Sequence, residues 1–268
     1  MPAIPDTRSA DTLVESVTLF HFGTLIIDQS MMTYRRGLGT MVEIPVTGAF
    51  IEMRDGEHIL FDTGMLPHGC DDGKHVTMSQ YRSLVVKYEP QDDIRARLAE
   101  IGRTPDDIKI VINSHFHWDH AGGNRLFPKS RFVVQSSEYR FAYSPDAFVS
   151  RPYARAYFDC GIDYELMQGD TMVKPGVGAL TTPGHTPGHQ SLMVRLPSGR
   201  TMIMTGDAML CPANLDPALP PGNAHTTEHA VASIARLKML ADLLGGDLVI
   251  CHDPDFWKKW RSAPHRYR

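Results

Sequence analysis

Short apolar runs alternate along this chain with longer segments in which apolar residues recur at helical spacing. Residues 47–54 and 57–62 both have the pattern of strands, and the Asp55-Gly56 pair between them is typical of a tight turn. These two segments therefore predict a hairpin. Other runs with the length and composition of strands are residues 13–28, 41–55, 108–113, 131–135, 178–182, 190–196, 201–205 and 247–253.

Helical spacing is clearest in residues 227–244, where apolar residues recur at intervals of three and four and Gly245-Gly246 follows as an end signal. Residues 91–102 show the same spacing, and Gly102 can cap their C-terminal end. Helices are also expected over residues 78–88 and from residue 136 onward, and a surface helix or arm over the basic tail, residues 257–268. Residues 144–165 are rich in aromatic residues and give no clear assignment.

Helical segments that alternate with buried strands indicate a layered α/β fold, in which helices cover the sheets. Residues 1–16 contain Pro, Ser and Asp and are expected to be a mobile lead-in. The remaining residues, 17–268, are expected to form a single domain, which the chain length allows.

Composition and charge exclude several classes of protein. The chain is 42% hydrophobic and has a formal net charge of −4, so its balance gives no electrostatic reason to bind nucleic acid or an anionic membrane. No apolar run is long enough for a membrane helix, and the first residues do not have the pattern of a secretory signal. We therefore expect a cytoplasmic protein. Its cysteines are expected to be free thiols, because they are widely spaced and form no CxxC pair; they are Cys70, Cys160, Cys211 and Cys251.

Four potential metal ligands lie within six residues in the segment His115-Phe-His117-Trp-Asp119-His120. Alternate side chains of an extended segment point the same way, so His115 and His117 can bind one ion together. Asp119 and His120 come after the chain turns toward a helix and therefore point to a second position. A lone histidine or aspartate is more often a capping or packing residue, but this concentration favours a metal site.

Three more candidates each come just after a predicted strand or at its end: His185, Asp207 and His252. Ligands at the carboxyl ends of separate strands are a common way for α/β folds to build a site. A single ion is normally satisfied by three or four ligands, so this number of candidates points to two ions.

These motifs resemble those of the metallo-β-lactamase superfamily. HFHWDH corresponds to its HxHxDH signature, and TPGHTPGH, GDA and CHD follow in the order of its later motifs. The resemblance implies an αββα sandwich with two central mixed sheets. It also implies one metal site at His115, His117 and His185, and a second at Asp119, His120 and His252. Asp207 would bridge the ions, Asp62 in FDTG would orient a ligand, and His189 would have a supporting or packing role.

Imidazole and carboxylate ligands without thiolates suit zinc, iron, manganese or cobalt, and zinc is the expected metal. Two such ions can share a water and lower its pKa to about 7, so that the bridging hydroxide attacks a carbonyl. Asp119 can take up the proton of the water and pass it to the leaving group.

Within the superfamily, SHFHWDHAGGN and TPGHTPGHQSL are most similar to the N-acyl-homoserine lactonases, the quorum-quenching lactonases. The expected reaction is therefore the opening of a lactone ring. An acyl chain could contact apolar residues of two early segments, namely Leu25, Ile26, Met31, Met32, Met65 and Leu66. Many of these lactonases carry a tyrosine three residues after the bridging aspartate, where this chain has Leu210. Tyr34, Tyr81 or His225 are the candidates to replace that phenol.

The alternatives on the same scaffold are a thioester hydrolase of the glyoxalase II type and a phosphotriester hydrolase. A β-lactamase, a nuclease, a flavodiiron redox protein and a non-catalytic binding module fit the ligand set or the chain length less well. The apolar residues of segment 78–88 also suggest a homodimer interface, which packing on the chain's own core would explain almost as well.

Overall fold

The computed structural model describes residues 12–66 and 85–268, and most of its strands lie in two sheets. The strands of the first sheet lie in the order β4 (Val85–Lys87), β1 (Val14–Asp28), β2 (Met41–Met53), β3 (His58–Phe61), β5 (Ile110–Ile112), β6 (Arg131–Gln135) and β7 (Tyr164–Met167). Those of the second lie in the order β12 (Gly246–Val249), β11 (Thr201–Met204), β10 (Gln190–Arg195), β9 (Val177–Thr181) and β8 (Thr171–Lys174).

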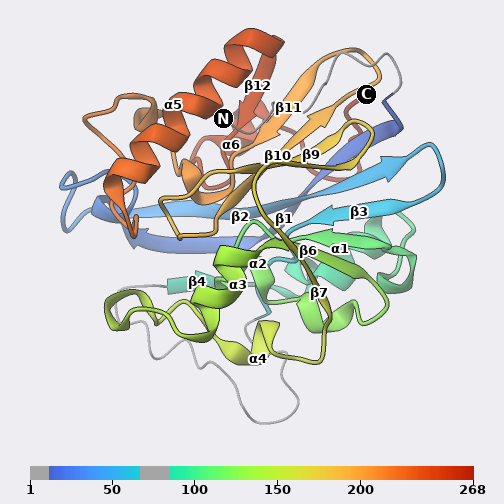
Figure 1. The fold of residues 1–268 in the computed structure, drawn as a ribbon, viewed down its shortest axis with the longest axis horizontal. Coiled ribbons are helices and arrows are strands. Elements are labelled where there is room, and N and C mark those ends of the chain that lie inside the picture. Colours follow the sequence, from blue (N-terminus) through green and yellow to red (C-terminus); the bar gives the residue numbers. More distant parts are fainter. Residues whose placement is uncertain (1–11, 67–84) are drawn as a thin grey trace.

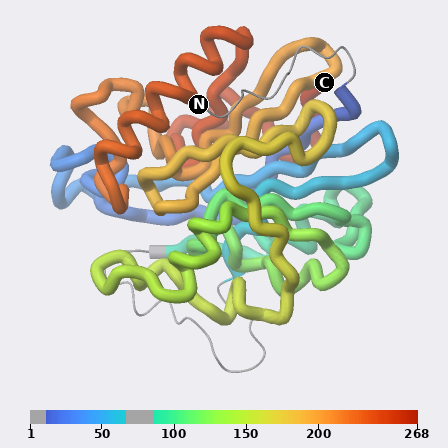
Figure 2. Tube along the Cα trace, in the orientation of Figure 1, coloured from blue at the N-terminus to red at the C-terminus, as the bar shows by residue number. Residues whose placement is uncertain are grey.

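The two sheets pack face to face, with helices on both outer faces (Figure 1). On the first sheet lie α1 (Ile94–Glu100), α2 (Trp118–Ala121), α3 (Ser136–Tyr143) and α4 (Arg155–Phe158). The outer face of the second is covered by α5 (Thr227–Leu244), and the short α6 (Phe256–Lys259) precedes the C-terminal residues. Figure 2 shows the same layers as a trace, with the green segment and the orange-to-red segment on opposite sides of the blue strands. This arrangement is the predicted αββα sandwich.

The inner core lies between the sheets and is built from apolar residues of both. Leu19, Ile51 and Ile59 of the first sheet belong to one buried cluster with Val194 and Met202 of the second. Burying a side chain of this size stabilises a fold by roughly 1.5–3 kcal/mol. The short strands β5, β10 and β11 are buried almost throughout, because each lies between this core and the helices outside it.

Helix α5 matches its predicted bounds, residues 227–244. Leu237 and Leu240 are buried against Leu180, Met193 and Ile203 of the second sheet, which explains the spacing of its apolar residues. The helix ends at Gly245, whose φ of +57° is a left-handed conformation that glycine adopts without a Cβ penalty.

Some expected elements differ from the structure. Residues 85–87 of the predicted helix 78–88 form strand β4, which pairs with β1, and Tyr88 follows it outside any helix. Residues 78–84 lie outside the described residues. Val14–Ser16 belong to β1, so the end of the expected lead-in, residues 1–16, is part of the first sheet. Strands β7 and β8 were missed, because their residues are only partly buried and show little apolar pattern.

The basic tail forms the short helix α6 and then an arm. The arm lies along β1, where backbone hydrogen bonds join Val17 to Tyr267 in both directions and Ala263 donates to Leu19. The described cysteines, Cys160, Cys211 and Cys251, are free thiols as expected. No helix in the described part of the chain is long and apolar enough to span a membrane.

Candidate metal centre

All seven predicted ligands come together at one edge of the sandwich, where strands of both sheets end. The HFHWDH segment follows β5 in the first sheet, while His185, Asp207 and His252 follow β9, β11 and β12 in the second. A backbone hydrogen bond joins the two sheets here, from the N–H of Gln190 to the carbonyl oxygen of Ser114. Each candidate therefore sits at the start of a loop whose first residue is fixed by a buried strand.

The ligand atoms form three overlapping groups, within each of which the atoms lie no more than 4.8 Å from one another. These groups are His115, His117 and His185; His115, His120 and Asp207; and Asp119, His120 and His252. The first and third match the two sites that the family resemblance implied, and Asp207 stands between them. All seven side chains are at most 12% exposed.

Hydrogen bonds at the rear of three imidazoles determine which nitrogen faces the centre. His120 Nδ1 lies 2.8 Å from the carboxylate of Asp62, and His252 Nδ1 lies 2.7 Å from the carbonyl oxygen of Pro45. His115 Nδ1 lies 2.9 Å from Ser114 Oγ, whose own proton goes to Asp62. Because each Nδ1–H is used as a donor, each Nε2 keeps its lone pair for the centre.

Several buried polar atoms at this centre have no hydrogen-bond partner among the described residues. Among the described residues, none forms a hydrogen bond with His115 Nε2 or Asp207 Oδ1. His120 Nε2 and His252 Nε2 face each other at 3.3 Å, and His117 Nδ1 and His185 Nε2 at 3.0 Å. Converging lone pairs of this kind are costly unless a cation lies between them, so the donor set fits metal ions.

The charges of the centre also favour a cation. Burial lowers the pKa of His115 well below its usual range, which keeps it neutral and able to coordinate. Burial also opposes the protonation of His120, but nearby carboxylates, foremost Asp207 and Asp119, raise its pKa well above its usual range. Burial would raise the pKa of Asp207, yet the surrounding imidazoles lower it well below its usual range. The pocket of carboxylates thus attracts positive charge, which a metal ion can supply.

Asp62 orients residues of this centre through hydrogen bonds. It follows β3 with a φ of +60°, a left-handed conformation that costs a non-glycine residue free energy. Its carboxylate accepts the backbone N–H and the hydroxyl of Ser114 at 2.7 and 2.8 Å, in addition to His120 Nδ1. The predicted orienting role of Asp62 therefore has a geometric basis, since one carboxylate fixes the rings of His115 and His120.

His189 does not join the ligands. Its Nε2 accepts the backbone N–H of Asp207 at 2.9 Å, and its Nδ1 lies 2.8 Å from Thr182 Oγ1. Burial lowers its pKa to about 3, so the ring is neutral. His189 therefore holds the loop of Asp207 in place, in line with the supporting role expected for it.

A buried carboxylate that the sequence did not single out joins the two ligand loops. Glu138, on α3, accepts the backbone N–H of Phe116 at 2.9 Å and the hydroxyl of Tyr153 at 3.0 Å, while its other oxygen accepts the hydroxyl of Thr186 at 2.5 Å. Burial raises its pKa despite these donors. The sequence does not indicate that Glu138 is buried, because its helical segment is polar and only the tertiary fold places it against the ligand segments.

A cavity of about 440 Å³ opens beside the ligands. Its lining combines polar residues, among them His117, Asp119, His185, Asp207 and His252, with an apolar wall that includes Leu25, Ile27, Met31, Ile44, Phe148 and Val149. Of the apolar residues expected to contact an acyl chain, Leu25 and Met31 line the cavity, while Ile26, Met32, Met65 and Leu66 do not.

Leu210 is buried and lines this cavity, so no phenol is present at that position. Of the three candidate replacements, His225 lines the cavity, Tyr34 does not, and Tyr81 lies outside the described residues. The ring of His225 is already bound on both sides, with Nε2 3.1 Å from Asp146 and Nδ1 3.0 Å from Thr226 Oγ1.

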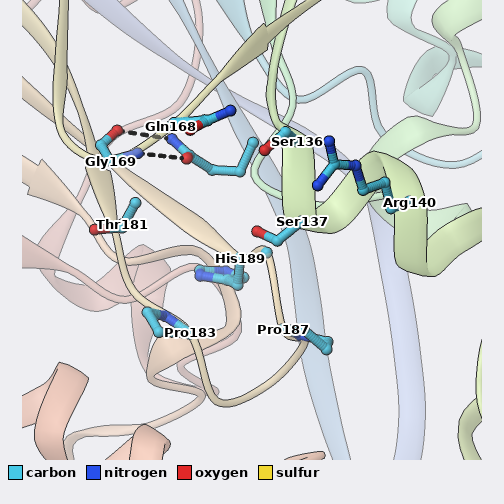
Figure 3. Close-up of a pocket in the computed structure, with 11 residues that line it drawn as sticks. Ser136, Ser137, Arg140, Gln168, Gly169, Thr181, Pro183, Pro187 and His189 are labelled. Atoms are coloured by element: carbon cyan, nitrogen blue, oxygen red, sulfur yellow. Dashed lines mark hydrogen bonds between the residues drawn. The ribbon is translucent and has the colours of Figure 1, made fainter.

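A second cavity, of about 360 Å³, has a polar lining that includes Ser136, Ser137, Arg140 and Thr181 (Figure 3). His189 also lines it, and none of the seven candidate ligands does. The substrate cavity is therefore the first one, beside the ligands.

An αββα sandwich with a buried cluster of imidazoles and carboxylates at its edge defines the class of metal-dependent hydrolases. The sequence model of the Metallo-beta-lactamase superfamily matches residues 43–252, and the chain belongs to that superfamily.

Curated relatives cover nearly the whole chain. It is 33% identical to the N-acyl homoserine lactonase AttM of Rhizobium radiobacter, over 91% of this chain and 95% of that protein. It is 30% identical to the N-acyl homoserine lactonase AiiA of Bacillus thuringiensis subsp. kurstaki, over 90% of this chain and 94% of that protein.

Solved structures agree with this placement. The crystal structure of a quorum-quenching N-acyl homoserine lactone hydrolase superposes with a TM-score of 0.84 at 29% identity, covering 96% of this chain and all of that one. A structure of N-acyl homoserine lactone hydrolase with the product N-hexanoyl-L-homoserine bound at its catalytic metal centre has a TM-score of 0.83 at 29% identity, with the same coverage.

Proposed function

We propose that this chain is a metal-dependent lactonase that opens the ring of N-acyl homoserine lactones or related lactones to give a hydroxy acid. The observation that carries the proposal is the convergence of seven buried ligand side chains beside a cavity that also has an apolar wall. A lactone ring fits beside the ligands and an acyl chain against the apolar wall. The names of the relatives and the product bound in a similar structure support this substrate class.

The proposed ligand assignment follows the geometry. His115, His117 and His185 would hold one divalent ion, and Asp119, His120 and His252 would hold a second, with Asp207 near both groups. Zinc is the proposed metal, because nitrogen and carboxylate ligands in this number suit it. When bound, such ions would supply Lewis-acid chemistry, which polarises a carbonyl and lowers the pKa of water to about 7.

The protein's own groups position the substrate and move the proton. Asp119 lines the cavity at the start of α2, and its carboxylate is the proposed acceptor of the proton that the attacking water loses. The same carboxyl group then returns that proton to the ring oxygen as the carbon–oxygen bond of the lactone breaks. The apolar wall excludes water from the acyl chain and contributes binding free energy.

Acid release in a pH-stat tests the proposal directly. Purified, metal-loaded protein is given an N-acyl homoserine lactone, a thioester and a phosphotriester in parallel. Ring opening of the lactone at the highest kcat/KM is the expected result. Turnover of the thioester or the phosphotriester without acid release from the lactone would reject the lactonase assignment. It would favour a thioester or phosphotriester hydrolase, which the absence of a tyrosine at Leu210 leaves open.

Four broader features are also proposals. Residues 17–268 are proposed to form one hydrolase domain that acts in the cytoplasm, with no nucleic-acid partner. A homodimer is proposed as well. The interface was expected on a helix over residues 78–88, but residues 85–87 form strand β4 and do not belong to a helix. Sedimentation of the purified protein measures the oligomeric state.

A further inference from the structure

Besides the candidate metal ligands, the described lining of the cavity contains an amide side chain, Asn223, whose hydrogen-bonding groups are unused. Asn223 lines the cavity together with Leu210 and Asp207. Its Oδ1 is buried, and neither end of its amide forms a hydrogen bond with any residue in the described ranges, 12–66 and 85–268. A buried unpaired carbonyl costs roughly 1–3 kcal/mol, and native proteins carry few of them. This one is therefore a candidate for pairing with a ligand.

The backbone of Asn223 is fixed from two sides. Its N–H donates to the carbonyl of Met31, which lies on the apolar wall, at 3.1 Å. Two residues later, the N–H of His225 donates to the carbonyl of the candidate ligand His185 at 3.2 Å. The segment also passes so close to Ser30 that a Cβ on Gly222 would lie 1.8 Å from the Ser30 carbonyl oxygen. Asn223 therefore stands at the junction between the apolar wall and the metal centre.

An N-acyl lactone has the same order of groups. Its acyl chain is joined to the ring by an amide, so a ring at the metal centre and a chain on the apolar wall place that amide at the junction. We propose that the carboxamide of Asn223 hydrogen-bonds to the exocyclic amide of the substrate and so selects N-acylated lactones over lactones without an N–H. This inference rests on the proposed lactonase function and assigns a binding residue to it.

The chemistry of the two amides is complementary. The Oδ1 of Asn223 can accept the substrate N–H, and its Nδ2 can donate to a carbonyl. Because the side-chain amide has no hydrogen-bond partner among the described residues, it can turn about its χ2 bond toward the cavity without breaking a hydrogen bond to any of them. His225 does not offer this freedom, since both of its ring nitrogens are already engaged.

The test compares two lactones that differ in one atom. One is N-octanoyl homoserine lactone, and the other is its analogue with an ester oxygen in place of the exocyclic N–H. Ring opening of each is measured for the holoenzyme and for Asn223→Leu, which has a similar volume and no hydrogen-bonding group, with His225→Gln as the matched cavity control. Asn223→Ala is measured alongside, because it only removes atoms.

The expected result is a fall of about fivefold to tenfold in the ratio of kcat/KM for the amide lactone over the ester analogue in both Asn223 variants. This corresponds to about 1.0–1.4 kcal/mol, the size of one neutral hydrogen bond. His225→Gln should change both rates by the same factor. Equal losses on the two lactones in the Asn223 variants would overturn the inference. A wild-type protein that opens neither lactone would instead reject the proposed function itself.

Discussion

At the scale of single residues, the metal centre depends on groups that do not touch the metals. Asp62 is the clearest case, because its carboxylate binds His120 Nδ1 and, through Ser114, also orients His115. A side chain with no chemistry of its own thereby fixes which nitrogen of two ligands faces the centre. Mutation of partners of this kind typically lowers metal affinity or activity by roughly 10- to 100-fold.

Asp62→Asn should weaken metal binding by roughly 10- to 100-fold, because an amide cannot accept all three hydrogen bonds that the carboxylate accepts. Titration with a chromophoric chelator measures the affinity. Asp106→Asn is the control, since Asp106 only forms an exposed ion pair with Lys129. Unchanged affinity in Asp62→Asn, with the control also unchanged, would show that Asp62 does not orient the ligands.

A second residue-scale prediction concerns pH. Burial lowers the pKa of His21 on β1 below its ordinary value of 6.5, so the folded state disfavours its protonated form. The stability that follows is fully present above pH 6.5 and is lost as the pH falls below that value toward the folded pKa.

His21→Gln should therefore flatten the fall in the free energy of unfolding between pH 7.5 and 5. Denaturant titrations of both proteins across this range measure it, with His229→Gln on the exposed face of α5 as the matched control. The other histidines contribute equally to wild type and variant, so the difference isolates His21. An identical slope in wild type and His21→Gln would contradict the prediction.

At the scale of elements, helix α3 holds together two of the segments that carry candidate ligands. Its Glu138 accepts hydrogen bonds from Phe116 in the HFHWDH segment and from Thr186 next to His185. The loop comes so close to α3 that a Cβ on Gly188 would lie 1.9 Å from the Glu138 nitrogen. The helix therefore couples the segment after β5 in one sheet to the loop after β9 in the other.

Glu138→Ala should lower the free energy of unfolding by about 2–4 kcal/mol, because three buried donors lose their acceptor. Glu138→Gln should cost less, since its amide oxygen still accepts and the Thr186 hydroxyl can turn to accept from the amide. Chemical denaturation gives both values. The control is Glu165→Ala, because Glu165 forms a surface ion pair with Arg131. Equal costs for Glu138→Ala and the control would contradict the role of α3.

At the scale of the whole molecule, the metal centre is the place where the two sheets depend on each other. Strands β3 and β5 bring Asp62 and the HFHWDH segment from the first sheet, and β9, β11 and β12 bring the other ligands from the second. Ions bound at this edge therefore link the two halves of the sandwich, and stability should be coupled to metal occupancy.

Removal of metal by a chelator should abolish lactone hydrolysis and lower the melting temperature. If the free metal is normally at about 100 times its Kd, binding stabilises the fold by about 2.7 kcal/mol, which corresponds to roughly 5–10 °C for a domain of this size. Calorimetry of the chelated and the zinc-restored protein measures the shift. A melting temperature that does not respond to either treatment would show that the two halves do not rely on the ions.

The sequence alone predicted most of the strands, the helix α5, the seven candidate ligands and the family, because these depend on local spacing: apolar residues at periods of two or 3.6, and histidines packed into a short motif. It did not predict β7 and β8, nor β4, where the chain pattern suggested a helix but pairing with β1 prevails. The hydrogen-bond partners of Glu138 and His189 and the place of Asn223 beside the cavity were decided only by the tertiary structure, since each depends on distant loops that meet where the two sheets end.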